Sequence, residues 1–153
     1  MTSRKPPRPA IWPLTPGESI AAECQRRGTP AVVSGCIDLL QGNPDVDDSL
    51  MLALAGPHAH YVLGGREGGR QGYWPRVWAA RGLLHVWDER ATAVIIAATA
   101  DDAWRVREMA AKVIARHCIA DALDAVVALR DDQVVRVRAA AERAVMILTS
   151  SGT

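Results

Sequence analysis

Four arginines that follow pairs of aspartates are candidate residues for binding an anion. The arginines are Arg105, Arg107, Arg136 and Arg138. A guanidinium group binds a phosphate or a carboxylate through the same two-point geometry. One interpretation is therefore a row of phosphate-binding arginines. We favour the other, a structural ladder in which these arginines pair with carboxylates at neighbouring turns, namely Asp102 and Asp132.

A second candidate is the glycine-rich segment 64–72, which carries Arg66 and Arg70 and leads directly into Tyr73 and Trp74. Glycine backbones can cradle anions, but this segment lacks the lysine and hydroxyl ending of a nucleotide-binding loop and follows no predicted strand. Arg, Tyr and Trp are over-represented in protein-binding hot spots. Long loops are commonly either functional or disordered. The sequence leaves both open: a partner-binding loop or a disordered insertion.

The histidines give little indication of a metal or a catalytic site. His58 and His60 form one H-x-H pair without a third ligand nearby, and His85 and His117 fall on or near apolar stripes of predicted helices. No Ser-His-Asp or Cys-His pattern suggests itself. We therefore expect no bound metal, no cofactor and no enzymatic activity.

The elements that position these residues are helices with a repeating apolar pattern. Within residues 104–117 the apolar positions have offsets of three and four, which is one stripe of an α-helix. The pattern returns one unit later in 137–148, and we also align it one unit earlier with 76–87, where Arg76 takes the place of Val106. A period of about 30 residues predicts a repeat architecture.

The motifs R-V-R-E-M-A-A-K-V-I (105–114) and R-V-R-A-A-A-E-R-A-V (136–145) resemble HEAT repeats of the short, PBS-lyase type found in bacterial proteins. The resemblance covers residues 74–148. It implies an all-α, right-handed superhelix, or α-solenoid, of about four helical hairpins. It also implies that an Arg–Asp ladder joins the units and that their second helices, 89–100 and 120–130, line the concave face.

The domain organisation follows from caps and composition. Residues 1–13 are basic and proline-rich and read as an extended or disordered lead-in. Residues 14–149 form one repeat domain, with an irregular half (14–73) and a regular half (74–148), and 150–153 are a tail. Within the irregular half, Thr15 and Glu18 predict a capping box, Gly28 a helix stop, and Asp47 or Asp48 the start of a third helix.

Charge argues against nucleic acid as the partner. The net charge is +1, and the predicted second helices carry Asp121 and Asp124 with arginine only at Arg90 and Arg130. A groove for nucleic acid needs Lys and Arg to offset phosphate charge. We therefore predict a non-enzymatic protein-interaction or scaffold module whose partner is another protein.

The alternative is a nucleic-acid-binding protein related to the HEAT-like DNA glycosylases that act on alkylated bases. The resemblance implies aromatic, acidic and basic residues along the groove of such enzymes. Residues that could take these roles are Trp74, Trp78, Trp104 and Asp102. They lie on or before the first helices, on the predicted convex side, which counts against this alternative.

The expected compartment is the cytoplasm. The three cysteines, Cys24, Cys36 and Cys118, are odd in number and widely spaced, and we interpret them as buried, reduced thiols. The N-terminal segment has no apolar core of a signal peptide. No uninterrupted apolar stretch approaches the length of a membrane span.

The predicted last helix, 134–148, has no second helix after it to cover its apolar residues. Met146 and Ile147 widen its apolar surface beyond one stripe. Because the end of a repeat stack normally needs a polar cap, we expect this helix to form a contact. The contact is either a homodimer through the helix or docking onto another protein.

Overall fold

The computed structural model describes residues 14–43 and 45–150, and in these residues every regular element is a helix. The all-α prediction is therefore confirmed. The α-helices are α1 (Pro16–Arg27), α2 (Thr29–Leu40), α3 (Asp48–Ala55), α4 (His58–Leu63), α5 (Trp74–His85), α6 (Thr92–Ala98), α7 (Trp104–His117), α8 (Leu123–Leu129) and α9 (Val135–Ser150). Short 3₁₀ helices are η1 (Arg66–Gln71), η2 (Glu89–Ala91) and η3 (Ala120–Ala122). Across the described residues, every helix is too short or too polar to span a lipid bilayer.

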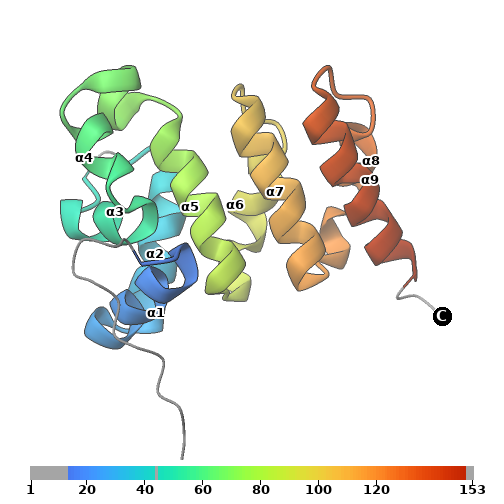
Figure 1. Cartoon of the computed structure of the whole chain (residues 1–153). Coiled ribbons are helices and arrows are strands. Elements are labelled where there is room, and N and C mark those ends of the chain that lie inside the picture. Colours follow the sequence, from blue (N-terminus) through green and yellow to red (C-terminus); the bar gives the residue numbers. More distant parts are fainter. Residues whose placement is uncertain (1–13, 44, 151–153) are drawn as a thin grey trace, which may run out of the picture.

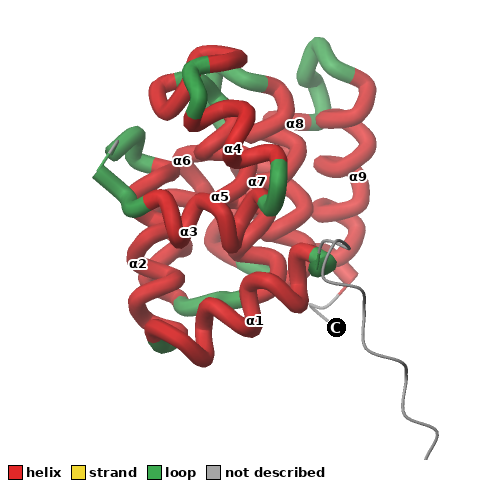
Figure 2. The backbone as a smooth tube through the Cα atoms, turned by 60° about the vertical axis from the view of Figure 1, so that its left-hand side comes forward, coloured by secondary structure: helices red, strands yellow, loops and turns green. Residues whose placement is uncertain are grey.

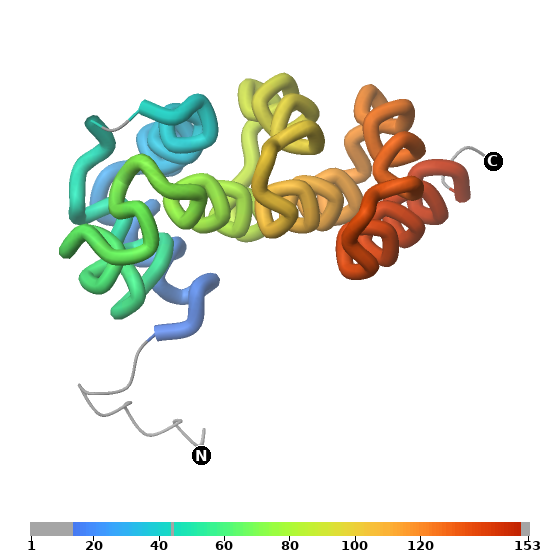
Figure 3. Tube along the Cα trace, turned by 90° about the horizontal axis from the view of Figure 1, so that it is seen from above, coloured from blue at the N-terminus to red at the C-terminus, as the bar shows by residue number. Residues whose placement is uncertain are grey.

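Three helices, α5, α7 and α9, lie side by side in a row (Figure 1). Direct packing joins α5 to α7 and α7 to α9. Seen from above, α2, α6 and α8 lie on one side of this row (Figure 3), and no comparable packing joins α6 to α8. The tube view in Figure 2 shows α1 to α4 gathered at the end of the row that α5 occupies.

The structure corrects the sequence alignment of α5 with α7 by one position. Arg76 pairs with Asp101, and Arg107 pairs with Asp132 in the same way. Arg76 is thus equivalent to Arg107, not to the apolar Val106. Buried positions obey the same alignment, since Ala79, Ala110 and Ala141 are all fully buried.

The irregular half folds from the caps that the sequence predicts. Thr15 and Glu18 form a complete capping box at the start of α1, and Asp47 caps α3 through the amide of Leu50 at 2.8 Å. Gly28 has φ 93°, a conformation that favours glycine, and it joins α1 to α2 without a longer loop. The predicted lead-in (1–13) and most of the predicted tail (151–153) lie outside the described residues, and Ser150 belongs to α9.

The larger of two apolar clusters in the described residues runs through both halves of the chain. Its larger members in the irregular half and at its junction with α5 include Ile20, Leu50, Leu54 and Trp78, all nearly inaccessible to water. Gly82 of α5 allows the closest approach, because a Cβ there would lie 2.7 Å from Leu54 Cδ2 and 3.2 Å from Cys36 Sγ. A glycine at this position therefore lets α5 pack against both α2 and α3.

The glycine-rich segment is packed at its C-terminal end, whereas residues 64–68 are exposed. It forms η1, and Gly69 within it is buried. Arg70 donates to the carbonyl of Val46 at 2.9 Å and also pairs with Asp48. These contacts hold the segment against the α2–α3 connection and α3.

Candidate interaction face

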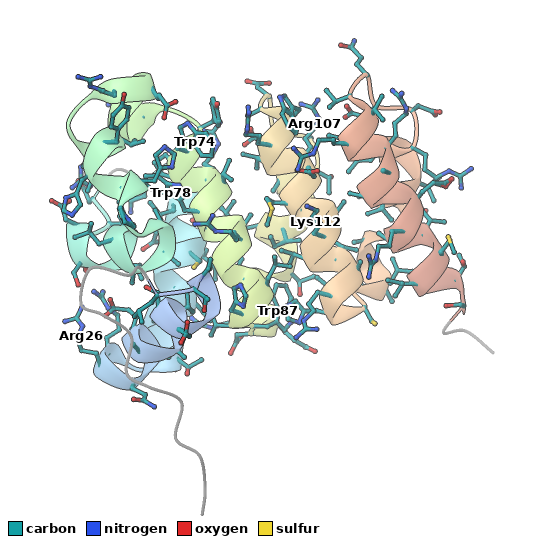
Figure 4. The ribbon with its side chains drawn as sticks, in the orientation of Figure 1. Arg26, Trp74, Trp78, Trp87, Arg107 and Lys112 are labelled. Carbon is teal, nitrogen blue, oxygen red and sulfur yellow. The ribbon has the colours of Figure 1, made fainter. Side chains whose placement is uncertain are left out.

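Side chains at equivalent positions of α5, α7 and α9 point to one side of the row that these helices form, and those of α5 also contact α1, α3 and α4. We call this side the basic face. Its positions form three series, each with one member on each helix: Trp74, Arg105 and Arg136; Arg81, Lys112 and Arg143; His85, Arg116 and Ile147. Lys112 lies at mid-height of α7 in Figure 4, below Arg107. Arg105 and Arg136 were considered from the sequence as phosphate-binding or ladder residues, but the sequence-based prediction placed the interaction surface on the second helices. The recurrence of Lys112 and Arg143 at equivalent positions of successive units was a signal for this face that the prediction did not use.

A groove of about 460 Å³ lies on the basic face, between α7 and its neighbours in the row. Apolar side chains line part of it: Leu84, Ala115, Ala140 and Ile147. The remaining lining residues are the cations Lys112, Arg116 and Arg143, all exposed to solvent. The groove therefore combines an apolar floor with a positively charged rim.

Glu108 is a carboxylate held beneath this face. Its side chain is 9% exposed and accepts a hydrogen bond from Arg136 Nε at 2.9 Å. Lys112 Nζ lies 3.7 Å from the same carboxylate. One acid is thus shared by two cations, while Arg116 and Arg143 have no ion pair within the described residues. The basic face consequently keeps a net positive charge.

The upper end of the basic face is a cluster of arginine and aromatic side chains. The Arg105 guanidinium carbon lies 4.5 Å from the ring centroid of Trp104 and 5.4 Å from that of Trp74. Arg105 also donates to the hydroxyl of Tyr73 at 3.4 Å. Arg136 lies 5.4 Å from the centroid of the same Trp104 ring. Tyr73 and Trp74, expected to act with the glycine-rich segment, therefore contact Arg105 of α7.

Trp74 is fixed from its other side by the irregular half. The His58 ring meets the Trp74 ring edge-on at a centroid distance of 4.7 Å, and His58 Nε2 lies 3.1 Å from the Glu67 carboxylate. The indole Nε1 of Trp74 is buried and has no hydrogen-bond partner within the described residues. His58 thus positions an aromatic ring.

The two arginines of the glycine-rich segment do not join this cluster. Arg66 donates to the Tyr61 hydroxyl at 3.0 Å and lies 4.8 Å from the centroid of that ring. Arg70 is held by Val46 and Asp48. The four residues that the sequence groups around this segment are therefore divided among three places in the structure.

The Arg–Asp ladder exists, but with different members from those expected. Arg107 pairs with Asp132, and the equivalent acid one unit earlier, which pairs with Arg76, is Asp101 and not the exposed Asp102. Arg138 donates to the carbonyl of Asp132 at 2.6 Å and meets no carboxylate within the described residues. Arg105 and Arg136 belong to the aromatic cluster, because they point away from the ladder on their helices.

The structure separates Met146 from Ile147. Met146 is 68% exposed on the outer side of α9. Ile147 is partly buried, packs against the core and lines the groove. Both residues were expected to widen the apolar surface of the last helix. Of the two, only Met146 is an exposed apolar residue at the end of the row.

The pKa of His85 fits a positively charged face. Burial, followed by the charges of Arg81 and Arg116, lowers the pKa of His85 below its ordinary value. Burial also lowers the pKa of Arg81, whose Nη2 donates to the carbonyl of Leu54 at 2.8 Å. His85 is therefore less readily protonated than a free histidine, and the charge of the face comes from its lysine and arginines.

Metal-ligating groups do not gather in the described residues. No group of three His, Cys, Asp or Glu side chains has the spacing of a metal site there. The cysteines depart from the expectation of buried thiols, since Cys118 is exposed and Cys24 is intermediate. Cys36 is buried, and that burial raises the pKa of its thiol to about 12. Its thiolate is too scarce at neutral pH for nucleophilic catalysis.

Comparisons with protein-family models, curated proteins and solved structures give no match to this chain.

Proposed function

We propose that this protein is a non-enzymatic interaction module that binds an acidic protein segment on the basic face of α5, α7 and α9. We also propose that the row is a short, right-handed HEAT-like solenoid. The repeated pairs Arg76–Asp101 and Arg107–Asp132, at equivalent places in successive units, support that architecture. A scaffold of this kind presents side chains at regular intervals to an extended partner.

The observation that carries the proposal is the composition of the groove. Its apolar floor includes Leu84 and Ile147, and its rim is formed by Lys112, Arg116 and Arg143. An amphipathic helix buries one apolar face in such a groove. Acidic residues beside that face would meet the three exposed cations. Both parts of the groove are then used by one partner.

The binding of nucleic acid, including the activity of an alkylated-base glycosylase, is the second candidate. The observation in its favour is the row of Arg105, Arg136 and Trp104 beside the groove. Aromatic rings and arginines together bind single-stranded nucleic acid through stacking and charge. The Trp104 ring already contacts Arg105 and Arg136. A charged phosphate backbone would also gain nothing from contact with the apolar floor of the groove. An acidic protein segment is therefore the better fit.

Free thiols support a cytoplasmic location as part of the same proposal. Cys24, Cys36 and Cys118 are unpaired in the described residues. Reduced cysteines, one of them exposed, are typical of a reducing compartment.

Fluorescence anisotropy with the full chain tests the proposal. The probe is a labelled amphipathic peptide of about 20 residues with Leu on one face and Glu beside it. We expect binding that weakens with salt, and an affinity loss of at least about tenfold in the variant Lys112→Glu/Arg143→Glu. The matched control, Arg66→Glu/Arg90→Glu, makes the same charge change outside the basic face and should bind like wild type.

Two outcomes would contradict the proposal. If single-stranded oligothymidine binds more tightly than the peptide and loses affinity in Lys112→Glu/Arg143→Glu, the second candidate is favoured. If neither probe binds, or if a peptide with Lys in place of Glu binds equally well, the basic face is not a site for acidic partners.

A further inference from the structure

The outer side of α9 carries a largely exposed stripe, which we call the end face. Its members recur at offsets of three and four along the helix: Val135, Arg138, Ala139, Glu142, Met146 and Thr149. Val135 is 67% exposed and Met146 is 68% exposed. This stripe is distinct from the basic face, because Arg136, Arg143 and Ile147 lie about a quarter-turn away around the helix.

The equivalent side of α7 is the side on which α9 packs. The positions one repeat unit before the end face include Arg107, Glu108, Ala111 and Ala115, of which the last three are buried. The end face of α9 is therefore equivalent to the side of α7 that α9 covers. On α9, no described residue covers it.

The hydrogen bonds of Arg138 indicate which groups would complement the end face. Arg76 and Arg107 each donate Nε and Nη2 to an aspartate of the next unit. Arg138 repeats the Nη1 bond that Arg107 makes to a carbonyl, here to Asp132 at 2.6 Å. Its Nε and Nη2 have no partner within the described residues. A surface with a carboxylate near Arg138 and apolar groups near the ends of the stripe would complement the end face.

The end face itself offers these groups when it meets its own copy in antiparallel orientation. A two-fold axis that crosses α9 between Ala139 and Glu142 places Val135 of one copy opposite Met146 of the other. It also places Glu142 of each copy within one helical turn of Arg138 of the other. We propose that a second copy of this chain covers the end face by this antiparallel α9–α9 pairing.

Symmetry favours a second copy over a different partner. An isologous interface requires a surface that is complementary to itself, and this stripe has a cation and an acid one helical turn apart between two apolar ends. Within the chain, Glu142 contacts only Arg130 among the described residues, at 3.4 Å, and both side chains are about half exposed. Such an exposed pair contributes little, so Glu142 is available to exchange partners.

Sedimentation velocity of the full chain over a dilution series tests this pairing. Wild type should shift from one chain to two as concentration rises. Glu142→Arg and Met146→Glu, both at exposed positions, should each raise the dissociation constant at least about tenfold. The charge-swapped variant Arg138→Glu/Glu142→Arg should associate more tightly than Glu142→Arg alone. Arg143→Glu, a charge reversal on the basic face, is the matched control and should associate like wild type.

A wild-type chain that stays single at every concentration overturns the pairing, as does unchanged association of Glu142→Arg and Met146→Glu. A charge-swapped variant that keeps its melting temperature but associates no more tightly than Glu142→Arg also overturns it. Peptide binding by Glu142→Arg should match wild type, so that failure of the pairing and failure of the proposed function are distinguishable.

Discussion

Arg107 and Asp132 form a two-point ion pair between α7 and the turn that leads into α9. Arg107 Nε lies 2.7 Å from Asp132 Oδ2, and Nη2 lies 3.2 Å from Oδ1. Arg107 Nη1 also donates to the carbonyls of Asp101 and Asp102 at 2.9 and 3.0 Å. Asp132 in turn accepts from the amide of Val134 at 2.9 Å. One arginine thus ties the start of its own unit to the start of the next.

Removal of this arginine should destabilise the fold. Arg107→Ala leaves the Asp132 carboxylate, 8% exposed, without its cation. We expect a loss of about 2–3 kcal/mol in the free energy of unfolding, somewhat below the ~3–5 kcal/mol typical of a fully buried pair. Urea denaturation followed by circular dichroism measures this. Arg138→Ala is the control, because Arg138 meets no described carboxylate, and it should cost less than about 1 kcal/mol. Equal losses in the two variants would contradict the role of the pair.

Acid should weaken the fold through two aspartates. The hydrogen bonds from Arg107 lower the pKa of Asp132 below 3.8, and those from Arg27 lower the pKa of Asp47 to about 2. Both folded-state pKa values lie below the unfolded value, so the unfolded chain takes up protons first as pH falls. The contribution is complete well above pH 3.8 and is lost as the pH falls toward about 2.

Asp132→Asn checks this pH dependence. The variant should be less stable than wild type at pH 6 and should lose less stability than wild type between pH 5 and pH 3, a window taken around the ordinary aspartate value. Thermal unfolding at each pH gives the comparison. Parallel curves for wild type and variant would mean that Asp132 does not titrate differently in the folded and unfolded chain.

Much of the fold was predictable because local signals and the repeat agree. The capping box at Thr15, the stop at Gly28 and the cap at Asp47 each depend on a few neighbouring residues, and each appears in the structure. The register of the ladder was not predictable from the apolar stripe alone. Small apolar positions of α5 and α7 match almost equally well whether Arg76 is aligned with Val106 or with Arg107. The Arg76–Asp101 contact and the burial of Ala79 in the structure decide between the two alignments.

A charge introduced on α7 tests which side of this helix faces the core. Val113 is fully buried, whereas Met109 in the same stripe is only partly buried. Val113→Asp introduces an unpaired buried charge and should cost at least ~3 kcal/mol. Met109→Asp can turn its carboxylate toward solvent and should cost less. The order of the two melting temperatures is the measurement, and the reverse order would place the core on the wrong side of α7.

Gly82→Ala should be destabilising even though alanine favours a helix. The added Cβ would lie 2.7 Å from Leu54 Cδ2, inside the buried junction of α5 with α2 and α3. Overpacking of this kind costs about 1–3 kcal/mol, more than the ~1 kcal/mol gained in helix propensity. Gly17→Ala is the matched control, because its Cβ would meet the exposed His85 ring at 3.2 Å and that ring can move. The control should unfold at or above the wild-type temperature.

Trypsin should distinguish the two arginines of the glycine-rich segment. Arg66 is exposed, and its side chain lies against the Tyr61 ring and hydroxyl. Arg70 is tied to Val46 and Asp48 beside a buried Gly69. We expect early cleavage after Arg66 and slow cleavage after Arg70, since cleavage requires local opening of the backbone. Mass spectrometry of the first fragments measures this, and earlier cleavage after Arg70 would show that its contacts do not hold in solution.

The candidate site was harder to predict than the fold, for reasons of geometry. Tyr73 and Trp74 adjoin the glycine-rich segment in sequence, but the start of α5 turns them toward Arg105, which belongs to the next unit. Met146 and Ile147 are adjacent in sequence, yet a step of one residue is about 100° around a helix. That rotation separates the end face from the groove. Composition alone could reveal neither separation.

The unequal packing of the two sides of the row has a mechanical consequence. α5, α7 and α9 are packed directly on one another, whereas α6 and α8 have no comparable contact. A cavity of about 340 Å³ between α2 and α6, lined by Leu40, Val94 and Ala97 among others, lies on that second side. Because packing is direct on one side of the row and sparse on the other, we expect the row to bend through changes in the spacing between α2, α6 and α8 while α5, α7 and α9 stay in contact.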